Sequence, residues 1–246
     1  MINKNCVMKK LFYILILVVA LISYTSCSND KDDNISVKPS ATGTMTDKEG
    51  NEYKWVRIDK LDWMAENLKC GMPYYDLTAV SDWGWLDNVV VVSDLKQAKQ
   101  YLADFGNYYS YQQALDNCPA GWRLPSDQDW KQLEMALGMK HNNAEREGWR
   151  DGAASLMIQS IDQGTGLNLR FGGELCKWGN INDNDKTVKP YRQYDEGMYW
   201  TSTVDSTMSN PCVFYRKIMP QINKVERRSA TTFAHYFCVR YVRDVK

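Results

Sequence analysis

The sequence NCPAGWRLPSDQDW, residues 117–130, contains the corner that decides the fold. Just before it, Ser110 and Gln113 have the spacing of a capping box, in which each side chain bonds the other residue's backbone N–H at the start of a helix. Pro119 and Gly121 then end that helix, because proline cannot continue it and glycine readily adopts the closing turn. The first half of the stretch therefore predicts a short capped helix followed by a turn.

A second helix is predicted to begin directly after this turn. Ser126 and Asp129 repeat the capping-box spacing. A buried stripe follows at helical spacing, and it consists of Trp130, Leu133 and Leu137. The stretch is as dense in polar and aromatic residues as an active site, but a helix–turn–helix corner accounts for these residues better than catalysis does.

The segments on either side of the corner favour strands. Residues 46–58, TDKEGNEYKWVRI, have the pattern of a hairpin with its turn around Gly50. Stretches rich in aromatic and β-branched residues are typical of strands, and they cover residues 197–204, 211–219 and 235–245. Two early helices followed by a mostly antiparallel, irregular β-sheet place the chain in the α+β class.

The N-terminus is predicted to be a lipoprotein signal peptide, residues 1–26. An apolar run, LFYILILVVALI at 11–22, follows two lysines and is shorter than the roughly 18 residues that a membrane-spanning helix needs. Thr25 and Ser26 then lead into Cys27, which resembles the acylated cysteine of bacterial lipoproteins. The alternative is a signal that is cleaved in the ordinary way or not cleaved. We expect Cys27 to carry the lipid.

Residues 27–44 are predicted to form an acidic polar tether. SNDKDDN, residues 28–34, resembles the tag that exports lipoproteins of the Bacteroidetes type to the outer face of the outer membrane, and the alternative is a solvated linker. Removing residues 1–26 removes three basic residues and no acidic ones, which leaves 27 basic against 30 acidic residues. A weakly acidic body is not drawn to anionic lipids or to nucleic acid, so membrane attachment is expected to come from the lipid.

Five stretches of the folded part are characteristic: DKEGNEYKWVRI, WMAENL, FGNYYSYQQALDNCPAGWRLPSDQDWKQLE, YWTST and CVRYVRD. Together they resemble the Fibrobacter succinogenes major paralogous domain family, over residues 45–246. The resemblance implies a surface or secreted lipoprotein of Bacteroidetes-like bacteria, and it implies no common catalytic activity.

The family looks related to the C-type-lectin-like fold, in which a cysteine at the end of a helix is bonded to a cysteine on a late strand. Cys118 and Cys238 match these places, so the resemblance implies a disulfide between them. The chain departs from the family pattern, because the closing cysteine usually stands where this chain has Tyr241. The alternative is that Cys118 stays buried and reduced.

The sequence shows no established catalytic motif. It has two histidines, His141 and His235, and neither belongs to an H-E-x-x-H zinc site. His235 and Cys238 would lie on opposite faces of one strand, because strand side chains alternate. Carboxylates for glycoside hydrolysis are available without a sequence signal that pairs them, namely Glu66, Glu134, Glu174 and Glu196. We predict that the protein is not an enzyme and has no metal site.

Two segments are candidate ligand contacts. Trp83 and Trp85 flank a glycine and would form a stacking platform, although burial over the core is the more usual role of such rings. The loop at 178–185 offers oxygen donors to a ligand or to calcium, from Asn180, Asn182, Asp183 and Asp185. We predict no cofactor, and calcium is the alternative that this loop leaves open.

The function predicted from these observations is a noncatalytic, lectin-like binding domain for glycan or protein. It would be carried on an outer-membrane lipoprotein that faces the cell exterior. Two alternatives remain at this point: an enzyme, either glycan-processing or of the oxidase type that uses a reactive cysteine pair, and a structural or adhesive component of the envelope.

Overall fold

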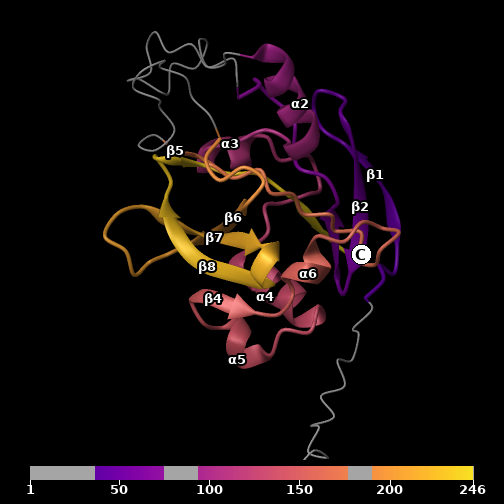
Figure 1. Cartoon of the computed structure of the whole chain (residues 1–246), viewed down its shortest axis with the longest axis vertical. Coiled ribbons are helices and arrows are strands. Elements are labelled where there is room, and N and C mark those ends of the chain that lie inside the picture. The colour runs from indigo at the N-terminus through magenta and orange to yellow at the C-terminus, as the bar shows by residue number, and fades with distance from the viewer. Residues whose placement is uncertain (1–36, 75–93, 177–189, 246) are drawn as a thin grey trace, which may run out of the picture. The chain divides into compact units, whose positions relative to one another are not determined.

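Three antiparallel sheets organise the described part of the chain, residues 37–74, 94–176 and 190–245 of a computed structural model (Figure 1). Their strand orders are β1-β2-β3-β10, β4-β8-β7-β6 and β5-β9. The strands are β1 Thr42–Thr46, β2 Glu52–Ile58, β3 Leu61–Met64, β4 Gly148–Asp151, β5 Leu175–Cys176, β6 Gly197–Val204, β7 Cys212–Met219, β8 Lys224–Thr231, β9 His235–Tyr236 and β10 Val242–Asp244. Mixed helices and antiparallel sheets confirm the α+β class.

The helices of the described ranges are short, and none of them is long and apolar enough to cross a membrane. They are α2 Leu95–Phe105, α3 Tyr111–Asp116, α4 Asp127–Ala136, α5 His141–Ala144, α6 Ala154–Met157 and the 3-10 helix η3 Pro220–Ile222. The two predicted capping boxes are both present, at Ser110 with Gln113 before α3 and at Ser126 with Asp129 before α4.

The predicted corner packs as expected. The Trp130 side chain has no exposed surface, and its ring meets Trp63 of β3 edge-on with centroids 5.0 Å apart. Leu133 and Leu137 lie in the same core cluster. Leu124, in the turn, is buried in the second cluster. The corner thus joins the first sheet to the rest of the core.

Some strand boundaries differ from the sequence prediction. Residues 235–245 do not form one strand, because residues 237–241, which we call the closing segment, make only isolated bridges, from Phe237 to Tyr109 and from Cys238 to Tyr199 of β6. All five residues are buried. β1 begins at Thr42, three residues inside the range expected as tether. β4 and β8 were not predicted, since several of their inward side chains are charged and obscure the apolar alternation that marks a strand.

Buried ion pairs hold α4 against the second sheet. The Glu134 carboxylate accepts hydrogen bonds from Arg150 of β4 at 2.6 and 2.8 Å and from Arg216 of β7 at 2.6 Å. Asp127 binds Arg216 at 2.7 Å and Arg227 of β8 at 2.8 Å. Burial alone would raise the pKa of Asp127, but the two guanidinium groups hold it below its usual range. Each of the two carboxylates is thus paired with two guanidinium groups, which compensates for the burial of its charge.

The structure corrects the predicted disulfide between Cys118 and Cys238. Both are free thiols. The Cys118 thiol points to the Trp122 carbonyl, 3.1 Å away, within the corner. The Cys238 thiol lies in the other core cluster, 3.6 Å from the Phe105 carbonyl and against Gly172. The two thiols therefore face different parts of the core.

Tyr241 connects the closing segment to α3. Its hydroxyl donates a 2.6 Å hydrogen bond to the Ala114 carbonyl in α3, and its ring is fully buried. In the resembled family a cysteine stands at this position. The hydrogen bond therefore ties the closing segment to the helix that leads to Cys118, where a cystine would otherwise tie it.

Arg240 connects three segments of the core. Its side chain is buried. It donates to the carbonyl of Met64, the last residue of β3, and to the side-chain amide oxygen of Asn67, three residues later. It also donates to the carbonyls of Leu167 and Asn168, each at 2.8 Å. These four acceptors are neutral, so the positive charge of the guanidinium is stabilised by the negative ends of four C=O dipoles. Burial lowers its pKa, but an arginine remains charged under ordinary conditions.

Replacing Tyr241 by cysteine is expected to allow a disulfide with Cys118. In the Tyr241→Cys variant, the new thiol would start from the position that already contacts α3. The oxidised form should exceed the reduced form by about 4 kcal/mol in free energy of unfolding, because the bond closes a loop of more than a hundred residues. Alkylation and mass spectrometry without reduction would detect the bond. Tyr215→Cys, at another buried tyrosine, is the control, and two alkylated thiols in Tyr241→Cys would show that the positions are too far apart.

Replacing Arg240 by lysine is expected to lower the free energy of unfolding by about 2–4 kcal/mol. Lysine keeps the charge, but it cannot reach four acceptors in the planar arrangement of a guanidinium, so buried carbonyls lose their donors. Urea denaturation would measure the loss. The exposed Arg228→Lys is the matched control and should change stability by less than about 0.5 kcal/mol. Equal stabilities of the two variants would contradict the role of Arg240.

Candidate functional site

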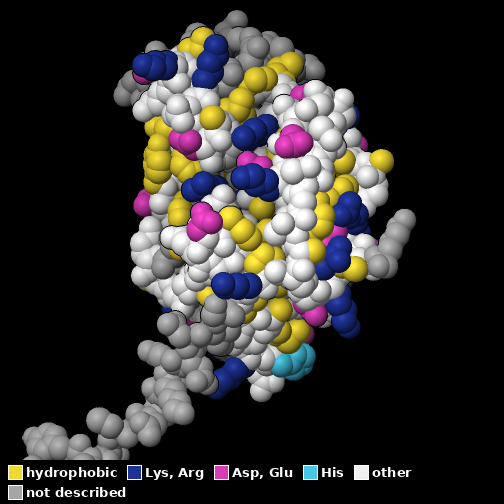
Figure 2. Space-filling view, turned by 90° about the vertical axis from the view of Figure 1, so that its right-hand side faces the viewer, with side chains coloured by type: hydrophobic (Ala, Val, Ile, Leu, Met, Phe, Trp, Pro, Cys, Tyr) yellow, Lys and Arg dark blue, Asp and Glu magenta, His cyan; other side chains and the backbone are white. Residues whose placement is uncertain are grey.

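An open groove lies between the first sheet and the segment 160–168, and we call it the Trp55 groove. Its volume of about 540 Å³ falls within the about 300–1,000 Å³ typical of ligand pockets. Its lining comes from β1, β2, the residues after β3 and the facing segment, and includes Gly43, Lys54, Trp55, Glu66, Ser160, Ile161, Asp162, Gly166 and Asn168. Figure 2 shows the face that carries β1 and β2, where basic, acidic and apolar side chains are interspersed.

Gly43 determines where the Trp55 ring lies. The two residues are directly opposite in the β1–β2 pair, and a Cβ atom at Gly43 would stand 2.5 Å from Cζ2 of the indole. The ring therefore lies across the strand at the glycine, and its Nε1 donates to the Thr44 carbonyl at 3.0 Å. The guanidinium of Arg243 lies 5.1 Å from the ring centroid. These contacts hold the half-buried indole in one orientation across β1, and Trp55 is one of the residues that line the groove.

Polar side chains line the same groove. The Glu66 carboxylate accepts a 2.8 Å hydrogen bond from the Lys54 backbone N–H, which orients it. Asp162 and Ser160 line the other wall together with Asn168. The Asn168 carbonyl accepts from Arg240, so the buried arginine holds this wall relative to the residues that follow β3. The groove thus combines an aromatic ring with hydrogen-bonding groups on a fixed frame.

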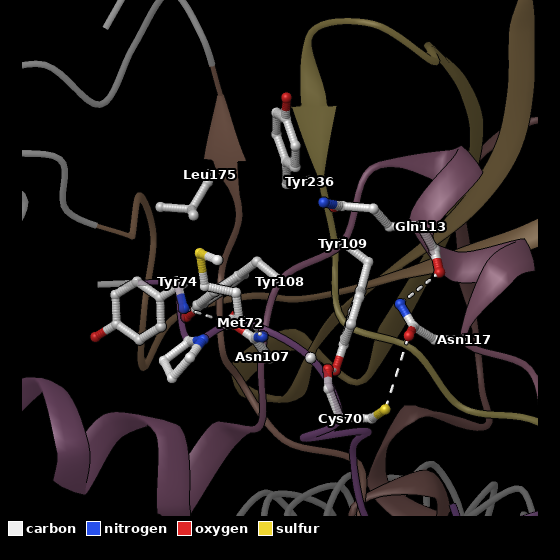
Figure 3. Close-up of a pocket in the computed structure, with 12 residues that line it drawn as sticks. Cys70, Met72, Tyr74, Asn107, Tyr108, Tyr109, Gln113, Asn117, Leu175 and Tyr236 are labelled. Carbon is white, nitrogen blue, oxygen red and sulfur yellow. Dashed lines mark hydrogen bonds between the residues drawn. The ribbon is translucent and has the colours of Figure 1, made fainter. Parts of the chain in front are cut away.

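A second cavity is too small for a ligand. It measures about 60 Å³ and is lined by residues of the 70–74 and 107–117 segments with Leu175 and Tyr236 (Figure 3). The Asn107 side chain lies beside it and bonds both the Tyr74 N–H, at 2.9 Å, and the Met72 carbonyl, at 2.7 Å. The Asn107 amide therefore holds the 70–74 segment in place, and the cavity has room for water only.

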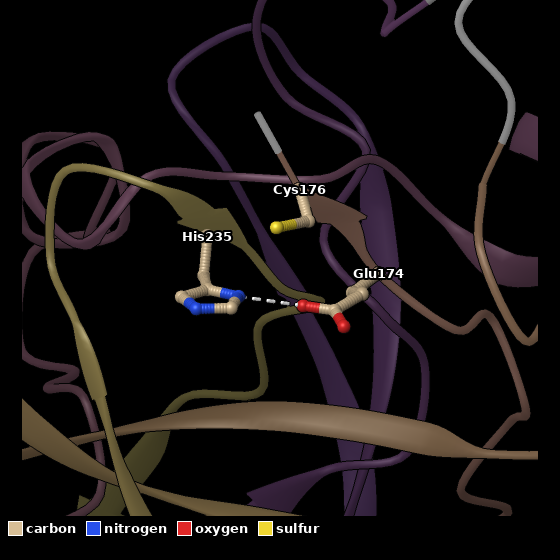
Figure 4. A group of neighbouring side chains, drawn as sticks. All are labelled: Glu174, Cys176 and His235. Carbon is tan, nitrogen blue, oxygen red and sulfur yellow. Dashed lines mark hydrogen bonds and ion pairs between the residues drawn. The ribbon is translucent and has the colours of Figure 1, made fainter. Parts of the chain in front are cut away.

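The outer face of the β5–β9 ribbon carries three chemically active side chains (Figure 4). Cys176 and His235 are directly opposite in the antiparallel pair, and Glu174 lies two residues before Cys176, so all three share one face. His235 Nδ1 is 2.7 Å from a Glu174 carboxylate oxygen. Burial lowers the pKa of His235, but hydrogen bonds to Cys176 and Glu174 raise it to about 9.

This cluster was not predicted from the sequence. The spacing of His235 and Cys238 led to the correct conclusion that these two do not form a pair. The actual partners, Glu174 and Cys176, lie some sixty residues earlier in the chain. The alternation of Glu174 and Cys176 around Leu175 indicates that these two side chains share a face. Nothing in the sequence indicates which strand lies opposite them.

Four other thiols are held protonated by burial. Burial raises the pKa of Cys70 and of Cys118 to about 11, and that of Cys238 to about 12. It also raises the pKa of Cys212. Because the thiolate is the nucleophile, these four side chains are poorly suited to covalent chemistry.

The four carboxylates considered for glycoside hydrolysis have separate roles. Glu134 has no exposed surface and is bound by two arginines. Glu196 is buried and lies 3.2 Å from the Lys217 ammonium. Glu174 binds His235, and Glu66 lines the Trp55 groove. Glu134 and Glu196 are therefore out of reach of a substrate.

Several predicted site residues lie outside the described residues. They are the lipidated cysteine Cys27 and the candidate ligand contacts Trp83, Trp85, Asn180, Asn182, Asp183 and Asp185. The Trp55 groove was missed, because Trp55 was interpreted as a strand residue and the 160–168 segment shows no motif. Only the fold brings the two together.

Comparison with known proteins gives one result that bears on this arrangement. No curated protein and no solved structure matches the chain. The likeness to C-type lectins therefore stays a prediction. The model of the Fibrobacter succinogenes major domain matches residues 56–243, from β2 to β10. That match spans well over half of the chain, which therefore belongs to the Fibrobacter succinogenes major domain family.

Proposed function

We propose that the protein is a noncatalytic binding module that takes glycan chains in the Trp55 groove. The observation that carries the proposal is the groove itself, whose lining includes Trp55 together with Glu66, Asp162 and Asn168. A sugar ring has an apolar C–H face and a rim of hydroxyl groups. It therefore complements an aromatic face surrounded by oxygen and amide groups.

The composition of the groove favours a glycan over an apolar ligand. Its two carboxylates and the Lys54 side chain would be costly to bury beneath an apolar molecule, whereas sugar hydroxyls can bond all three. The indole is also fixed before any ligand arrives, because Gly43 and the Thr44 carbonyl set its position. A fixed ring costs little conformational entropy on binding.

The proposed module resembles a lectin in its function and, as the family likeness implies, in its fold. An enzymatic role has less support among the described residues. Glu134 and Glu196 are buried in ion pairs, and four thiols are held protonated. A structural envelope component would need no groove with a fixed aromatic ring.

We further propose that a lipid on Cys27 anchors the module to the outer membrane, facing outward. The support is the order of basic head, apolar core and small residues before Cys27, followed by the acidic 28–34 segment. An anchored chain of this kind would present the folded domain to glycans of the surroundings.

Replacing Trp55 by alanine is expected to weaken glycan binding at least 10-fold, about 1.4 kcal/mol, because the stacking surface is lost. A glycan array would identify a ligand for the full chain, and calorimetry would measure its affinity for both proteins. Trp149→Ala is the matched control, since Trp149 is also half-buried beside a cation, the Lys217 ammonium at 5.8 Å.

The array should be repeated with EDTA. Binding in the Trp55 groove needs no ion and is expected to persist. Binding that EDTA abolishes and that survives Trp55→Ala would place the site at a metal-dependent position, such as the 178–185 loop, and overturn the groove. Silence across the array, with capture of a protein by the same face, would replace glycan with protein as the ligand.

Replacing Cys27 by serine is expected to release the protein from the membrane fraction, because serine offers no thiol for acylation. Metabolic labelling with an alkyne fatty acid should mark the wild-type chain and leave Cys27→Ser unmarked. Cys118→Ser keeps the proposed anchor and serves as the control. Labelling of Cys27→Ser at the wild-type level would show that the lipid is elsewhere.

A further inference from the structure

We propose that Glu174, Cys176 and His235 form a zinc-binding site on the β5–β9 ribbon. Within the described ranges these three side chains bring a carboxylate oxygen, a sulfur and an imidazole nitrogen within 4.8 Å of one another. They are partly buried, with 12% of the Glu174 side chain and 25% of the His235 side chain exposed, so an ion can enter from solvent.

The ribbon preorganises the three ligands. Cys176 and His235 are a directly opposed pair, whose Cβ atoms in an antiparallel ladder stand about 5 Å apart. Glu174 is held by backbone hydrogen bonds to Tyr191 in both directions, at 3.0 and 2.7 Å. Each ligand therefore projects from backbone whose position is set by hydrogen bonds, which lowers the cost of ordering the site.

The donor set is one that zinc prefers. Thiolate, imidazole and carboxylate bind zinc at about 2.3, 2.0 and 2.1 Å, in tetrahedral geometry. Two of these ligands around one tetrahedral ion are separated by about 3.4 Å. The 2.7 Å between His235 Nδ1 and the Glu174 oxygen needs to open by well under 1 Å. Three protein ligands leave the fourth position to water or to a donor from solvent.

The arrangement fits a metal better than a cysteine nucleophile. In a catalytic triad the carboxylate bonds one imidazole nitrogen and the nucleophile approaches the other. Figure 4 instead shows the Cys176 sulfur and the Glu174 carboxylate on the same side of the His235 ring, near the edge that bears Nδ1. Three donor atoms within 4.8 Å of one another are placed to share one ion.

The consequence of zinc binding would be local. The ion would link β5 to β9, two strands of only two residues each. Zinc taken up from solvent would therefore also stabilise the position of the 174–176 segment. This site and the Trp55 groove are built from different elements, so either proposal can fail while the other stands.

Zinc titration of the metal-depleted full chain, in competition with a chromophoric chelator, tests the proposal. We expect one equivalent of Zn²⁺, and we expect Cys176→Ser to weaken binding at least 100-fold, since even outer-shell changes at metal sites cost 10–100-fold. Cys118→Ser, at a half-buried thiol in the corner, should bind as the wild type does. Substituting Co²⁺ should give a thiolate-to-cobalt charge-transfer band that Cys176→Ser lacks.

Two results would overturn the site: no binding that competes with the chelator, or binding that is unchanged in Cys176→Ser and His235→Ala. Near-ultraviolet circular dichroism of the metal-free variants would establish that they are folded. If Cys176→Ser does not fold, Glu174→Gln decides the question by the same titration, since it keeps the size of the side chain and removes the anionic ligand. Several weak equivalents that persist in Glu174→Gln would also contradict the proposal.

Discussion

A buried arginine with neutral partners sets the arrangement of this domain. Arg240 donates to an amide and to three carbonyl oxygens, from the residues around the end of β3 and from the Leu167–Asn168 turn. The Leu167 and Asn168 carbonyls lie outside the sheets and helices, so the guanidinium supplies donors that neighbouring backbone does not. The closing segment can run through the core because the Arg240 side chain donates hydrogen bonds to backbone carbonyls of the segments on either side of it.

The same constraint shapes the Trp55 groove. Asn168 lies in one wall of the Trp55 groove, and Ala65 and Glu66, which follow β3, lie in the other, so Arg240 connects the two walls. The closing segment begins at the end of β9, which carries His235. The β5–β9 ribbon is a separate two-stranded sheet, and the Glu174, Cys176 and His235 side chains on one of its faces are partly exposed.

Local signals carried much of the fold. The capping boxes at Ser110 and Ser126 concern residues three apart, so the sequence alone predicts both helix starts correctly. The prediction of a disulfide between Cys118 and Cys238 was wrong, and it did not rest on a local signal of this kind. It rested on a resemblance and on two cysteines in a plausible order, whereas the hydroxyl of Tyr241 makes the contact with α3. A hydrogen bond from tyrosine to a backbone carbonyl has no sequence pattern that predicts it.

The sequence by itself determined the α+β class, the two capped helices, the hairpin, the family and the absence of common catalytic motifs, because these depend on short-range spacing and composition. Only the tertiary structure decided that β2 faces the 160–168 segment and that Cys176 faces His235. Those pairs are set by strand register and by the packing of distant segments. A shift of one residue would turn each side chain to the opposite face, and nothing in the local sequence records which register the core selects.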